Sequence, residues 1–534
     1  MTVHIPITTR QRGSSSLTLW LGLILAVALL VLGVVGALNV PRAMTPSAAG
    51  TTLASQPMTA IESTLRVSPD NPRYFADSSG HLVYLTGSHT WSNLQDGGFS
   101  NPPPEFDYTA YLDFLTDNHH NFFRLWAWEN GKWGAGWSDD FWIEPMPYAR
   151  TGPGTALDGG RKYDVSMFNQ AYFDRLRARV VEAQDRGMYV SIMLFNGWSL
   201  DDKDLGGANP WHAHPFHADN NVNGINGDPN GDDSGQETHS LQIDAITALQ
   251  EQYVKHVIDT VNDLDNVLYE ISNESGSQSQ DWQYHMIGLI KEYEATKPKQ
   301  HPVGITVEYP GGDNGELWRS NADWISPNGS LDDIPPNDGS KVVLLDTDHL
   351  CGICGDRVWL WKSVTRGYNP LLMDPYDGVN WGFPPGYAPT DPTWVSLRLN
   401  MGYARMYAER MDLAHMTPRG ELCSTGYCLA KPTADAAAYL VYAPDGGEFT
   451  VDLSATSGDV HVEWFNPATG ATTVLDDTAG GAVQSFTPPF AGDAVLYLYQ
   501  DAVAPEGPNK AFLPLVEHRE TDSSAAGYGP CGTP

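Results

Sequence analysis

The sequence predicts an α/β fold: a (β/α)8 TIM barrel followed by a small C-terminal β-sandwich. Eight apolar, strand-like runs alternate with helical periodicity between about residues 67 and 425. After Cys428 the pattern changes to short runs of alternating apolar and polar residues. The turn signals "PDGG" and "NPATG" separate these later runs. A chain of 534 residues is long enough for one large barrel and a smaller module.

The N-terminal part of the chain carries an uncharged apolar segment, residues 17–38, with Arg10 and Arg12 before it. That length can span a bilayer as a helix, and a basic flank usually stays in the cytoplasm. We therefore expect a cytoplasmic N-terminus at residues 1–16 and a single-pass transmembrane anchor at 17–38. A cleaved signal segment is the alternative. Either way, the remainder would be extracytoplasmic, at the cell surface or secreted.

The segment 39–66 is rich in Ala, Ser, Thr and Pro, which is typical of a flexible stalk. The barrel follows at residues 67–429. Its eight expected strands lie within residues 81–91, 120–130, 188–198, 266–274, 301–310, 323–328, 341–349 and 369–378.

Helices are expected between several of these strands. In residues 240–263, apolar residues recur at three- and four-residue spacing. Residues 173–187 behave similarly and end in Gly187, a favourable helix C-cap. The connections at about 130–165 and 199–239 are unusually long. Residues 430–500 form the expected sandwich, and residues 501–534 the expected disordered tail.

The cysteines fit an exported protein. Cys351 and Cys354 in "CGIC" have no second CxxC pair to complete a zinc site, so a local disulfide is favoured. Cys423 and Cys428 could close another small disulfide loop.

The formal net charge of −34 argues against nucleic acid as a partner, because such a field repels phosphate. A neutral or cationic partner is more compatible with it. Acidity that only keeps an exported protein soluble is the alternative interpretation. The oligomeric state does not follow from the sequence.

Polar and aromatic side chains at the C-terminal ends of the predicted strands are the candidate site, because function in this fold gathers there. Indole faces stack on the C–H faces of sugars, while carboxylates and amides bind the hydroxyls. The candidate substrate-binding residues are His89, Trp91, Arg124, Trp126, Trp128, Asn196, Trp198, Asn273, Glu308, His349 and Asp374. This set predicts a poly- or oligosaccharide substrate.

Two opposed carboxyl groups can cleave a glycosidic bond, one protonating the leaving oxygen and the other attacking or activating water. Glu274, after an apolar strand and Asn273, is the candidate proton donor. No Gly-rich phosphate loop, HExxH or GxSxG motif supports phosphoryl transfer, a zincin or a serine hydrolase.

The segment "YEISNES" resembles the fourth-strand Asn-Glu of the large retaining clan of (β/α)8-barrel glycosidases. The segments "RYFADSSGHLVYLTGSHTW", "FFRLWAWEN" and "DTDHLCGICGDRVWLWKS" look like a narrower group, the apiosidase-like glycoside hydrolases. "VEWFNPATG" resembles the collagen-binding-type β-domain that ends many of them. The resemblance implies a retaining glycoside hydrolase with Glu274 as acid/base, Asn273 as a sugar contact and Arg124 beside the nucleophile.

The sequence departs from that clan at the seventh strand, where the clan places a nucleophilic Glu. Here the strand ends in "DTDH", so the candidate nucleophiles are Asp346 and, as the alternative, Asp348. The two lie two residues apart and would share a face of the strand.

The loop containing "DPNGDD" lacks the Gly and Glu that an EF-hand needs, since Asp233 and His239 stand there. We expect a loop that shapes the substrate cleft, with a calcium site of another kind as the alternative. We expect no metal or cofactor. A non-catalytic carbohydrate- or matrix-binding protein on a degenerate barrel is the second hypothesis for the whole chain.

Overall fold

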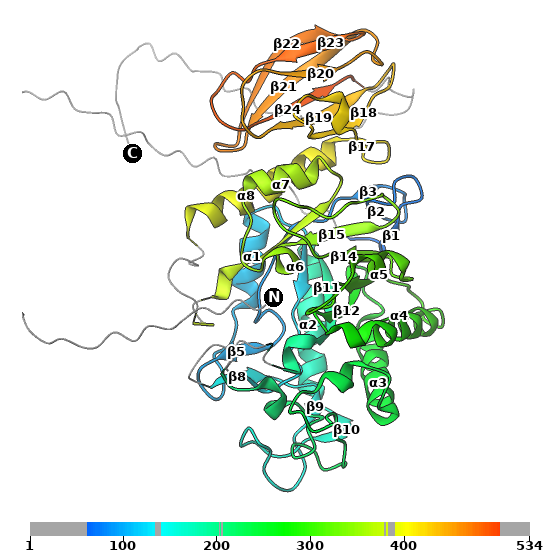
Figure 1. Ribbon diagram of the computed structural model, residues 1–534, viewed down its shortest axis with the longest axis vertical. Coiled ribbons are helices and arrows are strands. Elements are labelled where there is room, and N and C mark those ends of the chain that lie inside the picture. Colours follow the sequence, from blue (N-terminus) through cyan, green and yellow to red (C-terminus); the bar gives the residue numbers. More distant parts are fainter. Residues whose placement is uncertain are drawn as a thin grey trace, which may run out of the picture. The chain divides into compact units, whose positions relative to one another are not determined.

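The computed structural model describes residues 61–133, 140–201, 203, 207–378, 381–382 and 390–501 (Figure 1). Eight parallel strands form the barrel sheet, in the spatial order β4-β16-β15-β14-β13-β12-β11-β6. Their bounds are β4 (Gly87–His89), β6 (Phe122–Leu125), β11 (Tyr189–Asn196), β12 (Val267–Asn273), β13 (Val303–Thr306), β14 (Trp324–Ser326), β15 (Val342–Asp346) and β16 (Asn369–Met373). Each falls within one of the eight predicted runs, which confirms the barrel.

Side-chain amides close the barrel between β4 and β6. Asn121 accepts the N–H of Thr86 through Oδ1 at 3.1 Å, and its own N–H donates to the Thr86 carbonyl at 3.1 Å. Asn93 donates to the carbonyl of Arg124 at 2.7 Å, just beyond this point. A Cβ on Gly87 would lie 2.1 Å from the Phe122 carbonyl oxygen, so this close approach requires glycine.

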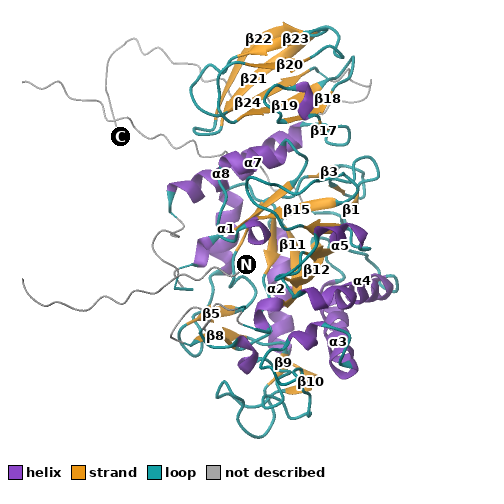
Figure 2. Cartoon of the chain, viewed as in Figure 1, coloured by secondary structure: helices purple, strands orange, loops and turns teal. Residues whose placement is uncertain are grey.

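Helices follow the strands in alternation, except between β14 and β15, where the described chain has none. They are α1 (Tyr108–Asp117), α2 (Gln170–Asp185), α3 (Asp244–Val261), α4 (Gln280–Glu294), α5 (Asn314–Arg319), α6 (Thr347–Leu350), α7 (Arg357–Val364) and α8 (Pro392–Arg410) (Figure 2). The predicted helices correspond to α2 and α3. Gly187 follows α2 with φ of 64°, as expected of a residue just past a helix C-cap.

Small antiparallel sheets decorate the barrel in the long connections, and the sequence patterns did not predict them. One contains β5 (Asp96–Gly98), β8 (Phe141–Glu144) and β7 (Lys132–Trp133), and another pairs β9 (Tyr148–Ala149) with β10 (Asp164–Phe168). The 3-10 turns are η1 (Gly197–Ser199), η2 (Pro210–Ala213), η3 (Gln236–His239), η4 (Ser277–Ser279), η5 (Pro375–Asp377) and η7 (Gly420–Leu422).

A further sheet precedes the barrel and contains β1 (Arg66–Val67), β2 (Phe75–Ala76) and β3 (Leu82–Val83). Leu65 is buried, so ordered packing begins inside the segment expected to be a stalk. The expected cytoplasmic N-terminus and anchor, the stalk up to residue 60, and the tail from 502 lie outside the described residues. Among the helices that the structure describes, none has the length and apolar content needed to cross a membrane.

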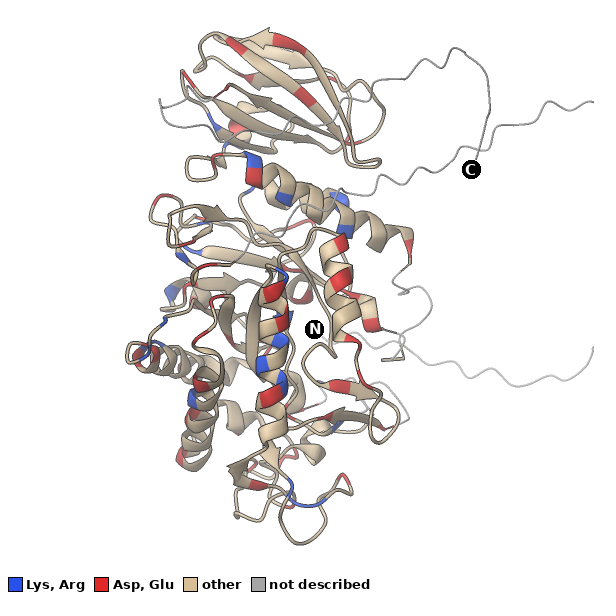
Figure 3. Ribbon diagram, turned by 180° about the vertical axis from the view of Figure 1, so that it is seen from behind, with Lys and Arg blue, Asp and Glu red and all other residues tan. Residues whose placement is uncertain are grey.

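The C-terminal sandwich has a six-stranded sheet in the order β17-β18-β19-β24-β21-β22, with a β20-β23 hairpin as the second layer. The strands are β17 (Thr417–Pro418), β18 (Cys428–Lys431), β19 (Ala438–Ala443), β20 (Phe449–Asp452), β21 (Asp459–Asn466), β22 (Ala471–Ala479), β23 (Val483–Phe486) and β24 (Ala494–Tyr499). The sheet therefore begins before residue 430. Lys431 is the only Lys or Arg in residues 430–500, and the charged side chains of this region are otherwise acidic (Figure 3).

The sandwich shares part of its core with the barrel helices. Trp361 of α7 and Tyr407 of α8 lie in one buried cluster with Tyr442, Phe465 and Tyr497 of the sandwich. A separate cluster fills the space between the two sandwich layers.

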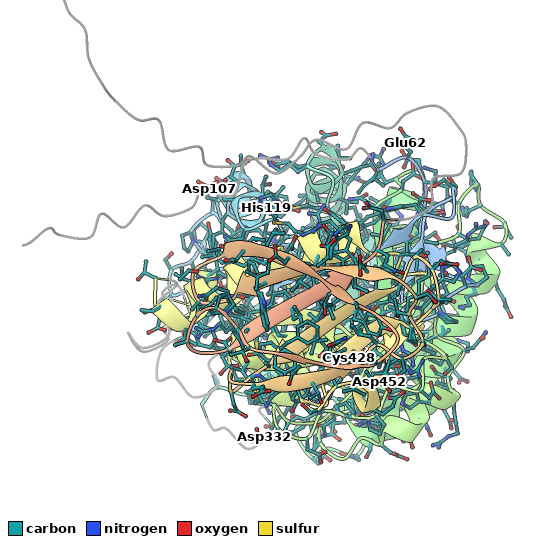
Figure 4. The ribbon with its side chains drawn as sticks, turned by 90° about the horizontal axis from the view of Figure 1, so that it is seen from above. Glu62, Asp107, His119, Asp332, Cys428 and Asp452 are labelled. Atoms are coloured by element: carbon teal, nitrogen blue, oxygen red, sulfur yellow. A yellow bond between two sulfur atoms is a disulfide. The ribbon has the colours of Figure 1, made fainter. Side chains whose placement is uncertain are left out.

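Cys351 and Cys354 form the predicted disulfide. The predicted bond between Cys423 and Cys428 is absent, and that prediction is wrong: both residues are buried free thiols in the sandwich. Cys428 is labelled in Figure 4. A hydrogen bond with Cys423, together with burial, holds the pKa of the Cys428 thiol well above its ordinary value. The two thiols thus pack as small side chains in the core.

Candidate active site

A cavity of about 540 Å³ opens at the C-terminal ends of the barrel strands. Seventeen residues line it: Trp91, Trp126, Trp128, Trp133, Trp198, Glu274, Val307, Tyr309, Asn328, Asp348, His349, Leu350, Cys351, Gly352, Ile353, Met373 and Trp381. Two of them are carboxylic acids, Glu274 and Asp348. The Cys351–Cys354 disulfide closes the loop that forms one wall.

All four predicted sugar platforms, Trp91, Trp126, Trp128 and Trp198, face this cavity. Two more indoles, Trp133 and Trp381, and the ring of Tyr309 also line the cavity and were not among the predicted sugar contacts. Trp128 and Trp381 stack with ring centroids 5.2 Å apart, and Trp198 and Tyr309 stack at 6.2 Å. Trp133 and Trp381 come from the long connections after β6 and β16, where no strand pattern marks a residue as facing the site.

Glu274 directly follows β12 and has φ of 47°, in the left-handed region. That conformation costs a non-glycine residue about 1–3 kcal/mol and persists only where the surroundings fix it. Gly197 is one such constraint, because a Cβ there would lie 2.3 Å from the Glu274 carbonyl oxygen. The indole N–H of Trp198 donates a hydrogen bond to Oε2 of Glu274.

The Glu274 carboxyl has a raised pKa. Burial raises its pKa, and the neighbouring charge of Asp348 raises it further, to about 8. The hydrogen bond from Trp198 and the charge of Lys203 act in the opposite direction but are outweighed. A raised pKa is what a general acid at this position requires.

Arg124, on β6, connects the buried carboxylates beneath the cavity. Its Nε and Nη2 bind Glu270 at 2.9 and 2.6 Å, and Nη2 also donates to Oδ1 of Asn273 at 2.7 Å. Its Nη1 lies 3.0 Å from Oδ2 of Asp346 and 2.8 Å from Oδ2 of Asp348. One guanidinium therefore serves three carboxylates.

Asp346 ends β15 and is fully buried. His89 Nε2 lies 2.8 Å from its Oδ2, and its Oδ1 accepts the N–H of Asp348 at 3.0 Å. Burial alone would raise the pKa of Asp346, but His89 and Arg124 outweigh burial and hold that pKa well below its usual range. Asp346 is thus a firmly ionised carboxylate that does not line the cavity.

Asp348, two residues further on in α6, does line the cavity. Burial raises its pKa against the opposing charge of Arg124, and the charge of Asp346 raises it further. Of the two candidates in "DTDH", Asp348 is therefore the one that shares an open space with Glu274.

The two predicted histidines have different positions. His89 is buried, stacks on Trp126 at 5.5 Å and contacts Asp346 rather than the cavity. His349 lines the cavity, with Nδ1 2.7 Å from Ser326 Oγ and Nε2 3.1 Å from Asn273 Oδ1. Burial lowers the pKa of His349 to about 3, so the ring is neutral.

Asn273 is buried beneath the cavity and does not line it. Arg124 and His349 engage its Oδ1, while its Nδ2 has no hydrogen-bond partner among the described residues.

Besides His89, Arg124 and Asn273, three more predicted substrate contacts do not line the cavity. Asn196 is buried, and its amide caps η1 through the N–H of Trp198 and donates to the Ala127 carbonyl. Asp374 is fully buried in an ion pair with Arg398, which satisfies its charge within the barrel wall. Glu308 is buried away from the cavity, and neither of its carboxyl oxygens has a hydrogen-bond partner among the described residues. Burial raises the pKa of Glu308 to about 7.

Within the described ranges, no group of three or more His, Cys, Asp or Glu side chains is arranged to hold a metal ion. His212, in the loop weighed as a calcium site, lies 2.8 Å from Oδ1 of Asp233. Asp228 accepts backbone N–H groups of its own loop.

Comparisons with known proteins agree with this architecture. Residues 132–310 match a domain of unknown function, DUF6298, and residues 422–498 match the "Putative collagen-binding domain of a collagenase". No curated protein matches the chain.

Two solved structures are similar in fold. One is described as a glycoside hydrolase, with 14% identity and a TM-score of 0.53, covering 83% of this chain and 99% of that chain. The other, a glycoside hydrolase family 5 protein from Bacteroides vulgatus, has 13% identity and a TM-score of 0.51, covering 82% and 93%. The chain therefore has the (β/α)8 fold of glycoside hydrolases, with a C-terminal domain that matches the collagen-binding type.

Proposed function

We propose that this protein is a glycoside hydrolase in which Glu274 is the general acid/base and Asp348 is the opposing carboxylate. The observation that carries the proposal is that both side chains line one cavity walled by indole rings. Sugars stack on such rings, and paired carboxyl groups across the stacked sugar supply the chemistry.

The proposed reaction has two steps. Glu274 donates its proton to the glycosidic oxygen while Asp348 attacks the anomeric carbon, which gives a glycosyl ester and releases the leaving group as an alcohol. The Glu274 carboxylate then removes a proton from water, the water oxygen attacks the anomeric carbon, and Asp348 leaves as a carboxylate. This route retains the anomeric configuration.

The residues beneath the cavity support these roles. Arg124 binds both Asp348 and Asp346, so it stabilises Asp348 as a carboxylate before attack and after release. We propose that Asp346, held by His89, keeps Arg124 in place instead of attacking the substrate.

Azide rescue with aryl glycosides that carry an activated leaving group tests the assignment. A panel of such glycosides and of plant and bacterial polysaccharides first identifies a cleaved substrate. We expect Glu274→Ala with azide to yield a glycosyl azide of the substrate's configuration, and Asp348→Ala to yield the opposite anomer. An inverted azide from Asp346→Ala instead would assign the nucleophile to Asp346. If Glu274→Ala keeps full activity, the proposed chemistry is wrong.

We further propose that the enzyme works outside the cytoplasm. The apolar segment 17–38 and the Cys351–Cys354 disulfide support this, since disulfides persist in oxidising compartments. Membrane fractionation of the full chain separates a membrane-anchored form from a secreted one, and recovery with cytosolic proteins would contradict export.

A matrix- or carbohydrate-binding protein without catalysis is the second candidate, favoured by the collagen-binding match at residues 422–498. Binding of the full chain to immobilised collagen, with no bond cleavage in the substrate panel, would support it over hydrolysis.

A further inference from the structure

A chain of buried polar side chains lies behind Glu274 and has no part in the reaction proposed above. It consists of Glu129, His239 and Ser275, and we refer to it as the Glu129–His239–Ser275 chain. Its members come from the connection after β6, from η3 and from the residue after Glu274. None of them lines the cavity.

The contacts within this chain are short. Ser275 Oγ lies 2.7 Å from His239 Nδ1, and His239 Nε2 lies 3.0 Å from Glu129 Oε1. Ser272 Oγ lies 2.5 Å from Ser275 Oγ at the other end. If Ser275 donates its O–H to His239 Nδ1, the N–H of His239 is on Nε2. Nε2 is 3.0 Å from Glu129 Oε1, but the ring is not aligned for a hydrogen bond, so this contact is electrostatic.

Glu129 anchors the far end of the chain. Its Oε1 accepts the backbone N–H of Asn196 at 2.8 Å, and its Oε2 lies 3.6 Å from His214 Nε2. Burial disfavours the Glu129 charge, but His239 and His214 outweigh burial and lower the pKa of Glu129 to about 2. The anchor is therefore a permanent anion tied to the end of β11.

A serine, a histidine and a carboxylate in this order could be mistaken for a nucleophilic triad. Ser275 and His239 are both fully buried, so no substrate carbonyl can reach Ser275 Oγ. The chain must act within the protein instead.

Its link to the proposed acid/base is covalent, because Ser275 directly follows Glu274 in the chain. Glu274 is in a left-handed conformation that its neighbours have to maintain. Ser275 is fixed through its side chain by His239, and its carbonyl accepts the N–H of Tyr309 at 3.0 Å. The Glu274 carbonyl accepts Lys203 Nζ at 2.8 Å.

We propose that Glu129, His239 and Ser275 are positioning residues that hold the Glu274 carboxyl in its buried place facing the leaving group. This rests on the proposed role of Glu274 as acid/base. Loosening the chain should let water reach the carboxyl and misalign it, and a displacement of about 1 Å can cost on the order of 10²-fold in rate.

The charged groups that face the Glu274 carboxyl are Asp348, Lys203 and Arg124. The titratable groups that interact with Glu129 from outside the chain are His214, Tyr148, Tyr172 and Tyr253. Burial is the largest cause of the raised pKa of Glu274. Hydration in a loosened site should therefore move that pKa downward.

The dependence of kcat/KM on the leaving group distinguishes a misplaced acid from a loss of folded protein. Substrates with a poor leaving group need protonation, whereas a dinitrophenyl leaving group does not. The variants are Ser275→Ala, His239→Asn and Glu129→Gln. In each, we expect the loss of kcat/KM on the substrate with the poor leaving group to be at least roughly 10-fold larger than the loss on the activated substrate.

His301→Asn is the matched control. His301 Nδ1 lies 2.7 Å from Glu294 Oε1, so this is another buried histidine–carboxylate pair, but it lies before the start of β13, at the opposite end of the strands. It should affect both substrates equally.

An infrared titration tests the inference without a substrate. The carbonyl band of the protonated Glu274 carboxyl, isolated as the difference between each protein and its Glu274→Gln form, disappears as the group ionises. We expect a midpoint near pH 8 without mutation and a lower midpoint in His239→Asn.

The positioning role would be overturned if the variants left the infrared midpoint of Glu274 unchanged and lost kcat/KM equally on both substrates. That result would leave the hydrolase proposal intact. A lowered midpoint in a protein that cleaves no glycoside of the panel would show that the chain keeps the Glu274 carboxyl buried, but would count against the hydrolase proposal and so against positioning toward a leaving group.

Discussion

Glu274 and Asp348 face one cavity from the ends of β12 and β15, and the charge of Asp348 raises the pKa of Glu274. Two strands, β13 and β14, separate their strands in the barrel. The two carboxyl groups thus reach the cavity from different strands while remaining electrostatically coupled. The charge of each carboxylate disfavours ionisation of the other, so the proposed mechanism requires the proton to be on Glu274.

The pH profile of kcat/KM should fall as pH rises through about 8. The pKa of Glu274 is about 8, and above that value the residue has lost the proton it must donate. The profile should be measured with a poor leaving group and compared with a dinitrophenyl glycoside, for which the alkaline loss should be weaker. An alkaline limb between pH 5 and 6 would contradict the raised pKa of Glu274.

Trp198→Phe should move that alkaline limb to higher pH. The indole N–H of Trp198 donates to the Glu274 carboxyl and stabilises the ionised form, so its removal favours the protonated form. The substitution keeps an aromatic ring in the cavity wall. Trp318→Phe, in α5 and away from the cavity, is the control and should leave the limb in place. A limb displaced to lower pH by Trp198→Phe would contradict the assigned hydrogen bond.

Glu274→Gln should stabilise the protein increasingly as pH rises from about 5 to 8. The pKa of Glu274 is higher in the folded state than the ordinary value of 4.5. Between those values the folded state therefore binds more protons than the unfolded state, and stability falls with rising pH. The glutamine side chain does not ionise, so the variant does not lose this free energy of unfolding. At pH 8 the difference is on the order of a few kcal/mol, since one pKa unit corresponds to about 1.4 kcal/mol.

The measurement is the difference in thermal midpoint between the two proteins at several pH values. This difference in thermal midpoint should be smallest near pH 5 and grow toward pH 8. A difference that does not depend on pH would contradict the raised pKa of Glu274.

The barrel could be predicted from the sequence because its strands are continuous apolar runs that end in polar residues. β12, for example, is buried along its whole length and is followed directly by Glu274. The four predicted tryptophans of the cavity were found for the same reason, since each stands at the end of such a run.

The other residues of the site stand at or just after the strand ends. There the alternating pattern of a strand no longer determines the direction in which a side chain points. Asp346 and Asp348 were expected to share a face, but β15 ends at Asp346 and the chain turns into α6. Only Asp348 then reaches the cavity. Asn196 and Asp374 also stand at strand ends, yet a cap and an ion pair with Arg398 turn them inward.

The contact between sandwich and barrel gives a final prediction. Glu463 of β21 is buried and binds Arg410 of α8 through two hydrogen bonds of 2.8 Å, and Tyr407 O–H donates to it at 2.6 Å. Arg410→Met leaves the Glu463 carboxylate buried without its cation. We expect a loss of about 1–3 kcal/mol, less than for a fully buried pair because the guanidinium is partly exposed.

The double variant Arg410→Met/Glu463→Leu removes the unpaired charge, so it should be more stable than Arg410→Met alone. Arg419→Met is the control, because the ion pair of Arg419 with Glu421 is exposed and should contribute little. Thermal unfolding followed by tryptophan fluorescence measures all three. Because Trp361, Tyr407 and Phe465 lie in one core, barrel and sandwich should unfold in a single transition. Two separate transitions, with only the sandwich affected, would show that the sandwich is an independent module.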